Sequence, residues 1–397
     1  MRVDHDIVIA GGGVAGAAAA ALLAQGGHRI ALIDRRRPED PDPTADFDPR
    51  VVAIAPGSAA VLSGAGAWER LPAERLGPYD RMQVHADGGE IEFRASEHGL
   101  AHLGWIVEVP WLQACGWQAL AEVENVELIA PAGVKGFSQR EDHVRIELDD
   151  GKTLRARLLV AADGARSRLR QMAGIETEIW HYNQQALVTH VTTERPNTGI
   201  AWQRFTEHGP LALLPLADGR SSIVWSQPER RATELKALDE TAFLAELNDY
   251  QDSPFGAATA STQRYAFPLI RRQATSLVRG RLILLGDAAR NVHPLAGQGL
   301  NLGLMDAAAL AEVLAEWTGD NDPARPLRHY ERWRISGGSM VAGGIHAINE
   351  FTRAGPGRAL AGLGFTAAGL LWPLREAFVE HACGLDRDSP KLARSAR

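Results

Sequence analysis

The first 34 residues contain two short apolar runs, a glycine-rich turn and one longer run of small apolar residues. Residues 7–10 and the segment "HRIALID" at 28–34 form the short runs, whereas residues 14–25 are almost wholly Ala and Leu. Short apolar runs bounded by turn residues predict buried strands, and the longer run predicts a helix packed closely on its neighbours. The order predicts a β-α-β unit whose parallel strands begin a doubly wound sheet.

The middle of the chain follows a different pattern. Apolar and polar residues alternate between 186 and 226, with a turn at Asp218-Gly219, which predicts an antiparallel sheet. The same kind of alternation predicts a hairpin at 81–95 around Asp87-Gly88-Gly89, and another at 144–161 that returns the chain to the parallel sheet. We further expect a buried strand at 281–285 and helices at 111–123, 229–250 and 300–317.

These elements predict an α/β protein with three parts. The parts are a doubly wound, Rossmann-like nucleotide-binding domain, an inserted, mostly antiparallel β-sheet domain for a substrate, and C-terminal helices. We assign residues 1–75, 101–175 and 276–340 to the nucleotide-binding domain, 76–100 and 176–275 to the β-sheet domain, and 341–397 to the C-terminal helical region.

Composition and charge exclude several classes of function. The formal net charge of -7 and the pI near 6.0 argue against nucleic acid as a partner, which needs clustered Lys and Arg. Cys115 and Cys383 are too few for a disulfide scaffold or a cysteine-ligated metal site. The 13 His form no ligand cluster with carboxylates, so we expect no metal.

The chain contains no segment that predicts a membrane span or a signal peptide. Its N-terminus lacks a basic region followed by a long apolar one. The uncharged segment 359–374 is 16 residues long and is interrupted by glycines, which is short of the roughly 20 needed to span a bilayer. Arginines flank this segment, so it is either a surface-seeking element or a core helix. We expect a cytoplasmic protein, or one peripheral to the inner face of the membrane.

A nucleotide motif lies between the first strand and the first helix. Gly11, Gly13 and Gly16 satisfy G-x-G-x-x-G, and Asp34 ends the next strand. The glycines permit a tight turn and close approach to a pyrophosphate at the helix N-terminus, and the acid accepts hydrogen bonds from ribose hydroxyls. This order favours a dinucleotide site over the alternative, a tight crossing of helix and strand with Asp34 solvated.

Two later motifs point to the same site. Asp163-Gly164 follows the apolar strand at 158–161 and would meet a diphosphate, although Asp163 could instead cap the next helix. Asp287 ends the strand at 281–285, where it would hold ribityl or ribose hydroxyls. Residues 296–301 then place free backbone N–H groups at a helix start, which favours the electron-rich edge of a reduced flavin. The alternative is a glycine-rich helix entry with Asp287 as its cap.

The three motifs together resemble those of a known family. The order G-x-G-x-x-G, "ADGARSRLR" and "GDAARNVHPLAGQGLN" resembles the FAD-dependent aromatic hydroxylases of the single-component flavoprotein monooxygenase class. Within that class, "HPLAGQGLNLGLMDAAALAEVL" and "QRFTEHGPLALLPLADGRSSIVWS" resemble the ubiquinone-biosynthesis hydroxylases that act on polyprenylated phenols. The resemblance extends from about residue 5 to residue 385, so it covers nearly the whole chain.

The resemblance implies a set of FAD contacts. It also marks one departure, because many similar proteins have His at the position of Arg290, which puts in doubt polar details carried over to that position. The implied contacts, from the pyrophosphate and adenosine end to the flavin, are Gly11, Gly13, Val14, Ala15, Gly16, Asp34, Arg35, Arg50, Gln113, Val134, Asp163, Asp287, Gly297, Gln298, Gly299, Leu300 and Asn301.

The resemblance also implies the chemistry. NAD(P)H reduces the flavin, O2 forms a C4a-hydroperoxyflavin, and one oxygen atom passes to the aromatic ring. His293 would polarise the phenol or pass a proton, with Pro294 stiffening the wall, unless His293 merely bonds a loop carbonyl. No second G-x-G-x-x-G domain exists for NAD(P)H, which would bind transiently at a surface groove. Arg166, Arg168 and Arg170 would attract its phosphate, or they form a solvated helix face.

Three alternatives remain for the function of the chain, and the first two differ in the substrate. The first is a polyprenylated phenol, which the enzyme would meet at a membrane or in a multi-enzyme ubiquinone complex. The second is a small soluble aromatic acid, for which Arg204 is the evident carboxylate partner. The third is a non-catalytic flavin-binding or lipid-binding accessory protein. Seven residues would form an apolar pocket wall, or ordinary core: Trp202, Phe205, Leu211, Leu213, Leu214, Pro215 and Trp225.

Overall fold

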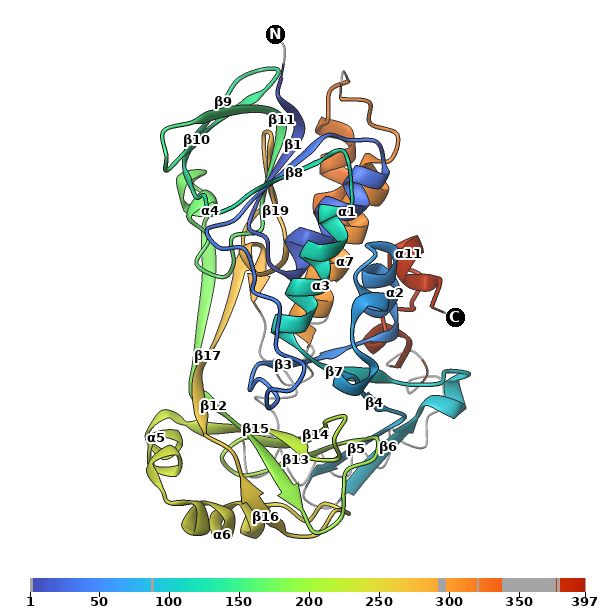
Figure 1. Cartoon of the computed structure of the whole chain (residues 1–397), viewed down its shortest axis with the longest axis vertical. Helices are drawn as coiled ribbons and strands as arrows, with labels where there is room; N and C mark the ends of the chain where they lie inside the picture. Colours follow the sequence, from blue (N-terminus) through green and yellow to red (C-terminus); the bar gives the residue numbers. More distant parts are fainter. Residues whose placement is uncertain are drawn as a thin grey trace.

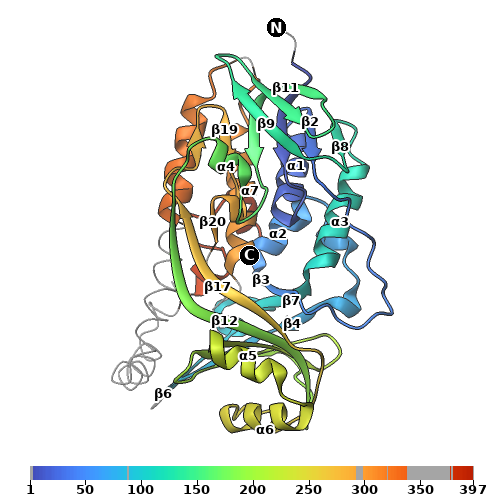
Figure 2. The same cartoon turned by 90° about the vertical axis from the view of Figure 1, so that its left-hand side faces the viewer.

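Three β-sheets organise the part of the chain that this computed structural model describes, residues 3–86, 89–291, 298–319, 321–337, 376 and 379–396 (Figure 1). The first sheet has eight strands, the second has nine, and a three-stranded sheet lies between them (Figure 2). The architecture is therefore the expected mixture of a parallel and an antiparallel part.

The first sheet is built around β1. In spatial order its strands are β18 (Val278–Arg279), β19 (Leu282–Leu284), β11 (Thr153–Ala161), β1 (His5–Ala10), β2 (Ile30–Ile33) and β8 (Val126–Ile129), and β11 also carries the hairpin of β10 (Val144–Leu148) and β9 (Val134–Gln139). β1 pairs in parallel with β2 and with β11, and β11 pairs in parallel with β19. The predicted β-α-β unit is confirmed.

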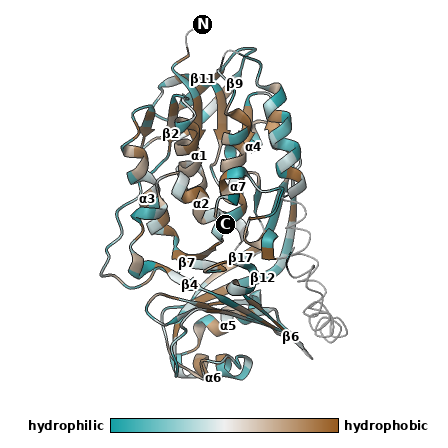
Figure 3. Ribbon diagram, turned by 90° about the vertical axis from the view of Figure 1, so that its right-hand side faces the viewer, coloured by the Kyte–Doolittle hydropathy of each residue, from teal (hydrophilic) through white to brown (hydrophobic). Residues whose placement is uncertain are grey.

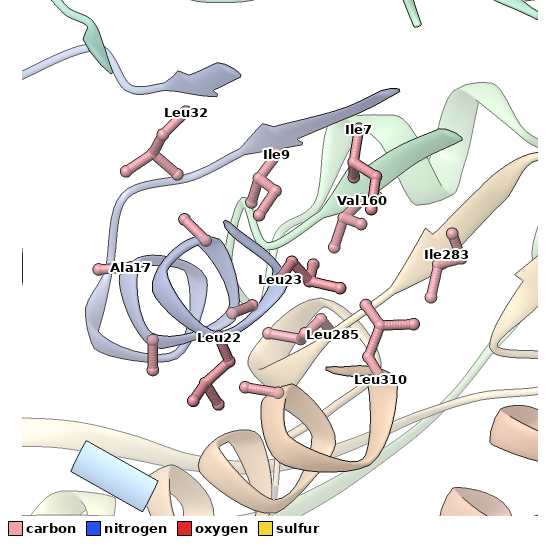
Figure 4. Packing of buried hydrophobic residues seen from close by; sticks show 14 of the residues in the cluster. Ile7, Ile9, Ala17, Leu22, Leu23, Leu32, Val160, Ile283, Leu285 and Leu310 are labelled. Carbon is pink, nitrogen blue, oxygen red and sulfur yellow. The ribbon is translucent and has the colours of Figure 1, made fainter. Parts of the chain in front are cut away.

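Small side chains allow close packing of the helices on this sheet. Helix α1 (Val14–Gln25) lies between the sheet and helix α7 (Gln298–Leu314), and α3 (Val109–Ala121) lies beside it (Figures 1 and 4). A Cβ at Gly303 of α7 would come within 3.2 Å of both the Ala15 Cβ and the Gly286 Cα. The small residues of α1 thus bring α7 directly against the glycine loop.

The hairpin β9–β10 extends from β11 and lies on the other side of the parallel strands from α1 and α7 (Figures 1 and 2). Hydrophobic residues concentrate between α1, β1 and their neighbours, whereas the outward sides of α3 and α6 (Glu240–Tyr250) carry more polar colour (Figure 3). Ile7, Ile9, Leu23 and Leu285 are no more than 1% exposed, which makes this interface the main core of the protein.

The second sheet is antiparallel except where β13 meets β5. In spatial order its strands are β20 (Arg290–Asn291), β17 (Tyr265–Ala274), β12 (Thr177–Thr193), β15 (Ser221–Pro228), β14 (Pro210–Pro215), β13 (Ile200–Phe205), β5 (Arg81–Ala86) and β6 (Gly89–Arg94), with β16 (Ala258–Ser261) also paired to β12. The long strands β12 and β17 of the second sheet run side by side, and their upper ends lie beside the first sheet (Figure 2). The hairpin predicted at 81–95 is confirmed as β5 and β6, and Asp87-Gly88 of its turn lies outside the described residues.

Two helices cover the outer face of the second sheet (Figure 2). The helical structure predicted at 229–250 is confirmed, and it consists of two helices. The chain forms α5 (Glu229–Ala237) and α6, because Leu238 is extended and the Asp239 side chain accepts a hydrogen bond from the Ala242 N–H to begin α6. Asp239 therefore acts as a helix start within a segment whose pattern looked continuous.

The small sheet and the short helices complete the fold. Other elements are β3 (Val51–Ile54), β7 (Gly104–Glu108), β4 (Gly77–Tyr79), α2 (Pro56–Gly64), α4 (Arg168–Met172), α11 (Lys391–Arg394) and the 3-10 turns η1 (Trp68–Arg70), η2 (Ala73–Arg75), η3 (Ala95–His98) and η4 (Gly286–Ala288). Residues 324–337 are helical as well.

Among the described residues, no helix is both long and apolar enough to cross a bilayer. The segment 359–374 lies outside the described residues.

Candidate functional site

A cavity of about 530 Å³ lies between the first and second sheets. Its upper wall contains the turns that follow β1, β11 and β19 and the start of α7, and its lower wall is the inner face of the second sheet. Ligands of doubly wound sheets bind beyond the carboxyl ends of the strands, and this cavity has that position. The three motifs, separated by more than 270 residues of sequence, therefore meet at one place.

The glycine loop forms one end of the cavity. Gly13, Val14, Ala15 and Gly16 line it, and no side chain caps the N-terminus of α1. Gly11 has φ +113°, and a Cβ there would overlap the carbonyl oxygen of Ala162. A Cβ at Gly13 would meet nothing within 4 Å, so at Gly13 the loop is open toward a ligand. Uncapped N–H groups at a helix start fit the pyrophosphate of a dinucleotide.

The carboxylate of Asp34 orders the same loop. It accepts hydrogen bonds from the Gly12 N–H at 2.5 Å and from the Arg36 N–H at 3.0 Å. Arg35 reaches the backbone just before Val134, because a Cβ at Gly133 would lie 3.3 Å from Arg35 Nε. These residues could enclose an adenosine, although they do not line the cavity itself.

Asp163 caps the helix that follows it, which is one of the two roles that the sequence left open. Its Oδ2 accepts hydrogen bonds from the Arg168 and Leu169 N–H groups, so it does help to begin α4. Its Oδ1 is buried and has no hydrogen-bond partner in the structure, while Ala162 and Gly164 on either side line the cavity. A buried carboxylate oxygen without a partner at this place suits a ligand or its bridging water.

Of the three arginines after Asp163, only two lie on a solvated face. Arg166 and Arg168 are exposed. Arg170 is 4% exposed and donates to the carbonyl oxygens of Ala288, at 2.8 Å, and Ala165, at 3.1 Å. For Arg170 the prediction of a surface or phosphate-attracting role was wrong, because it ties α4 to the turn that contains Asp287.

Asp287 stands in the 3-10 turn η4 at the end of β19, open to the cavity. Burial among the surrounding protein atoms raises the pKa of this carboxyl. The hydrogen bond with the Asn291 side chain and the charge of Arg272 lower the pKa, but by less. It is the only charged side chain among the described residues that line the cavity. A carboxylate held in this way is suited to accept hydrogen bonds from ligand hydroxyls.

A buried ionic cluster supports this turn from behind. Both carboxylate oxygens of Asp306 on α7 accept hydrogen bonds from Arg290, at 2.8 and 2.9 Å, and Arg334 Nε donates to one of them at 2.7 Å. Asp306 also accepts from the Gly286 N–H at 3.2 Å. Arg290 is 2% exposed and does not line the cavity, so the departure at position 290 affects the support of the Asp287 turn rather than a ligand contact.

The start of α7 forms another part of the wall. Gly299, Leu300 and Asn301 line the cavity. The Asn301 amide also binds β3, because its Oδ1 accepts from the Ala55 N–H at 3.0 Å and its Nδ2 donates to the Ala53 carbonyl at 2.8 Å. His293, Pro294 and Gly297 lie outside the described residues, as does the side chain of Gln298.

The two cofactor candidates from the intervening segments behave differently. Gln113 of α3 lines the cavity. Arg50 does not, because its guanidinium pairs with Asp48 at 2.9 Å and is largely exposed. Two contacts hold the segment before Arg50 in place. The guanidinium carbon of Arg75 lies 4.7 Å from the centroid of the Phe47 ring, and Asp46 forms an ion pair with Arg220.

The inner face of the second sheet is the apolar wall. Trp202, Leu211, Leu213 and Trp225 were considered as wall or as core, and they are core, because they pack toward α5 and α6 with Phe243. Leu214 does line the cavity. The residues that line it from this sheet alternate with the core residues: Ala201, Gln203, Pro210, Ala212, Leu214, Val224 and Ser226.

The sequence did not point to several residues of the site. Trp117 of α3 donates from Nε1 to the Gly12 carbonyl at 2.7 Å, and a Cβ at Gly12 would collide with its ring. The middle one of three consecutive glycines was the available signal, because G-x-G-x-x-G does not require glycine there. Tyr79 and Cys383 also line the cavity, and burial raises the pKa of the Cys383 thiol to about 12, so it stays protonated.

The site has the composition of an organic-cofactor site. Within the ranges that the structure describes, no three His, Cys, Asp or Glu side chains converge to hold a metal ion. The cavity instead offers an uncapped helix N-terminus, the carboxylate of Asp287 and an apolar wall, which fit the phosphates, hydroxyls and flat ring of FAD.

Comparisons with known proteins agree with this geometry. A family model described as the FAD binding domain matches residues 4–341. The chain is 35% identical over 386 residues to 3-demethoxyubiquinol 3-hydroxylase of Escherichia coli (strain K12), which covers 96% of this chain and 98% of that protein. It is 36% identical over 402 residues to ubiquinone hydroxylase UbiL of Rhodospirillum rubrum, which covers 98% of this chain and 92% of that protein.

The fold is also found among solved structures. The p-nitrophenol 4-monooxygenase PnpA of Pseudomonas putida DLL-E4 superimposes with a TM-score of 0.76 over 97% of this chain and 100% of that chain, at 20% identity. At this level of identity the match concerns the fold.

Proposed function

Because the chain belongs to the family of FAD-dependent hydroxylases of ubiquinone biosynthesis, we propose that it uses NAD(P)H and O2 to hydroxylate the aromatic ring of a polyprenylated phenol. The family makes it an FAD-dependent aromatic-ring monooxygenase. Its relatives are named for ubiquinone biosynthesis, and we place this chain in the same pathway.

The chain's own residues would divide the work with the cofactor. When bound, FAD supplies the activation of O2 and the transfer of one oxygen atom. We propose that the loop from Gly11 to Gly16 binds its pyrophosphate, that Asp287 accepts from its ribityl hydroxyls, and that the start of α7 lies at its pyrimidine edge. The apolar sheet would hold the substrate ring and exclude water from the reacting atoms.

The observation that most supports a neutral phenol is the charge of the cavity wall. Among the described lining residues there is no Lys and no Arg. A small aromatic acid would need a cation for its carboxylate, because burying an unpaired charge is costly. Arg204, the candidate for that role, pairs with Asp252 at 2.9 Å and does not line the cavity. The wall therefore favours an uncharged ring.

The remaining partners are proposals that follow from this substrate. We propose that NAD(P)H binds transiently near the exposed Arg166 and Arg168, close to Asp163. A polyprenyl tail implies that the protein meets its substrate at a membrane surface or within a multi-enzyme complex. We also propose the division into residues 1–75, 101–175 and 276–340 for FAD, 76–100 and 176–275 for the substrate, and 341–397 as the C-terminal part.

Steady-state oxidation of NAD(P)H by the FAD-loaded protein tests this function. A prenylated phenol should stimulate oxidation and yield a hydroxylated product, a phenol without the tail should do so less efficiently, and 4-hydroxybenzoate should do neither. Preference for the carboxylate would support the alternative of a soluble aromatic acid. Flavin binding without stimulation by any phenol would support a non-catalytic accessory protein instead.

A further inference from the structure

The apolar wall of the cavity contains two polar side chains whose role is unassigned. Gln203 of β13 and Ser226 of β15 line the cavity, whereas the other five lining residues of β13, β14 and β15 are Ala, Pro, Leu or Val. Both residues are buried, at 7% and 2% exposed. The alternation of each strand turns their neighbours Trp202 and Trp225 to the opposite face, so the orientation of this pair follows from the register of the sheet.

Neither side chain has a hydrogen-bond partner among the described residues, although buried polar groups normally do. Other buried glutamines differ in their surroundings. Gln184 Nε2 donates to the His208 carbonyl at 2.7 Å, and Gln251 Nε2 donates to the Gly256 carbonyl at 2.8 Å. The amide of Gln227 also has no partner, but it is fully buried and does not line the cavity. The polar atoms of Gln203 and Ser226 are left open to the cavity, which indicates that their partner is a ligand.

The spacing of the pair suits one aromatic ring. Gln203 is opposite Ala212, which is opposite Val224, and Ser226 lies two residues further along β15. Two strand separations and two residues of rise place the two Cα atoms roughly 12 Å apart. Ala212 and Val224 lie between them in the register and also line the cavity, so no large side chain separates the pair.

We propose that Gln203 and Ser226 bind the oxygen substituents of the substrate ring and so select an oxygenated, uncharged arene. This inference rests on the proposed function, and it names the residues that determine its specificity. The amide of Gln203 and the hydroxyl of Ser226 can each donate and accept. They can therefore bind a phenolic hydroxyl, which donates, and an alkoxy or second hydroxyl oxygen, which accepts. Neither carries a charge that would favour a carboxylate.

Two contacts on one ring also fix its rotation in the plane. A single hydrogen bond would let the ring pivot, whereas two contacts on opposite sides present a defined carbon to the flavin side of the cavity. The two residues are positioning residues, because they hold the ring without taking part in oxygen transfer. Their loss should weaken binding and should reduce the fraction of NAD(P)H oxidation that yields hydroxylated product.

The test uses the FAD-loaded protein and a phenol with a short prenyl tail and one methoxy group. Two analogues lack either the hydroxyl or the methoxy oxygen. Dissociation constants are measured from the change in flavin absorbance. The wild-type protein should bind each analogue about tenfold more weakly than the parent, as expected for one lost hydrogen bond. Gln203→Leu and Ser226→Ala should each remove one of these two discriminations, and the double variant should remove both.

Matched control variants are available on the same strand. Gln227→Leu and Ser222→Ala change buried residues of β15 that do not line the cavity. Both controls should keep the wild-type discrimination and the wild-type ratio of product to NAD(P)H oxidised. If Gln203→Leu does not fold, Gln203→Asn withdraws the amide by one methylene and should lose the same discrimination.

The outcomes separate this inference from the function on which it rests. Wild-type protein that turns over prenylated phenols, with Gln203 and Ser226 variants that discriminate among the analogues as the controls do, would overturn the inference alone. Wild-type protein that is not stimulated by any phenol would overturn the proposed function, and this inference with it.

Discussion

The two halves of the cavity are built by different parts of the polypeptide. On the side of the first sheet, the wall consists mainly of backbone at the uncapped start of α1, the Gly286-Asp287 turn and the start of α7, together with the carboxylate of Asp287. On the side of the second sheet, they come from alternate side chains of β13, β14 and β15. The backbone half suits a cofactor that never varies, whereas the side-chain half can be changed residue by residue to suit a substrate.

The largest expected effect is on the free energy of unfolding, when the buried ionic cluster behind the Asp287 turn loses its carboxylate. Asp306→Ala leaves Arg290 and Arg334 buried beside each other without a carboxylate, and losing one partner of a buried pair costs about 3–5 kcal/mol. Chemical denaturation should show this loss in the free energy of unfolding. As a control, Asp252→Ala breaks the exposed pair with Arg204 and should cost at most about 1 kcal/mol. Equal losses in both variants would contradict the support role of Asp306.

The glycine loop gives the next effect, on the affinity for FAD. Gly11→Ala places a Cβ over the Ala162 carbonyl at φ +113°, and strain of this kind costs on the order of 3 kcal/mol. We expect the dissociation constant of FAD, measured by flavin fluorescence, to rise by about a hundredfold or more. Gly136→Ala, where a Cβ meets no atom within 4 Å, is the control and should bind FAD normally.

Two adjacent leucines test the side-chain half. Leu213 packs toward α5 and α6, whereas Leu214 lines the cavity. Leu213→Ala should cost about 2–5 kcal/mol of unfolding free energy and leave phenol affinity unchanged. Leu214→Ala should cost less stability and should weaken binding of a prenylated phenol. Reversal of this pattern would mean that the two faces of β14 have been exchanged.

The smallest effect concerns His190, which joins β12 of the second sheet to the segment before Arg50. Its Nε2 lies 3.2 Å from the Asp48 carbonyl. Burial lowers the pKa of His190, and Arg220 adds to this, while the contact with Asp48 and the charges of Asp46 and Asp218 oppose it. The folded protein therefore binds fewer protons than the unfolded chain below the ordinary value of 6.5. Stability should fall as pH decreases from 6.5 toward the lowered pKa.

Thermal unfolding between pH 5 and 7 checks this sign. His190→Asn should flatten the dependence of the unfolding free energy on pH in that range. A variant whose unfolding free energy depends on pH as steeply as that of the wild-type protein would contradict the assignment to His190, and the comparison with the variant removes the opposite contribution of His381, whose pKa is raised by Asp386.

The same difference between the halves explains what the sequence could predict. The first sheet, its β-α-β unit and the meeting of Gly13, Gly164 and Asp287 followed from motifs, because a turn that must lie close to a ligand requires glycine in fixed spacing. The strands of the second sheet also followed from alternation. Which face turned to the cavity did not, since apolar residues occupy both faces and only the position of α5 and α6 decides between Leu213 and Leu214.

Three further features depended on tertiary contacts between distant residues. Arg170 looked like a surface or phosphate-binding arginine, and the sequence left the role of Arg290 open, but both are buried, with the Ala288 carbonyl and Asp306 as their partners. Trp117 reaches Gly12 across 105 residues of sequence. No local pattern encodes such pairings, because each depends on how separate elements pack.

The central claim is that the two halves form one site, in which bound FAD oxidises a neutral phenol held by the second sheet. Incorporation of oxygen from ¹⁸O₂ tests it most directly, using the FAD-loaded protein, NAD(P)H and a prenylated phenol, with mass spectrometry of the product. The account predicts a ring-hydroxylated product that carries one ¹⁸O atom and is formed only when FAD is present. An unlabelled product, or phenol recovered unchanged while NAD(P)H is consumed at the same rate without it, would contradict the claim.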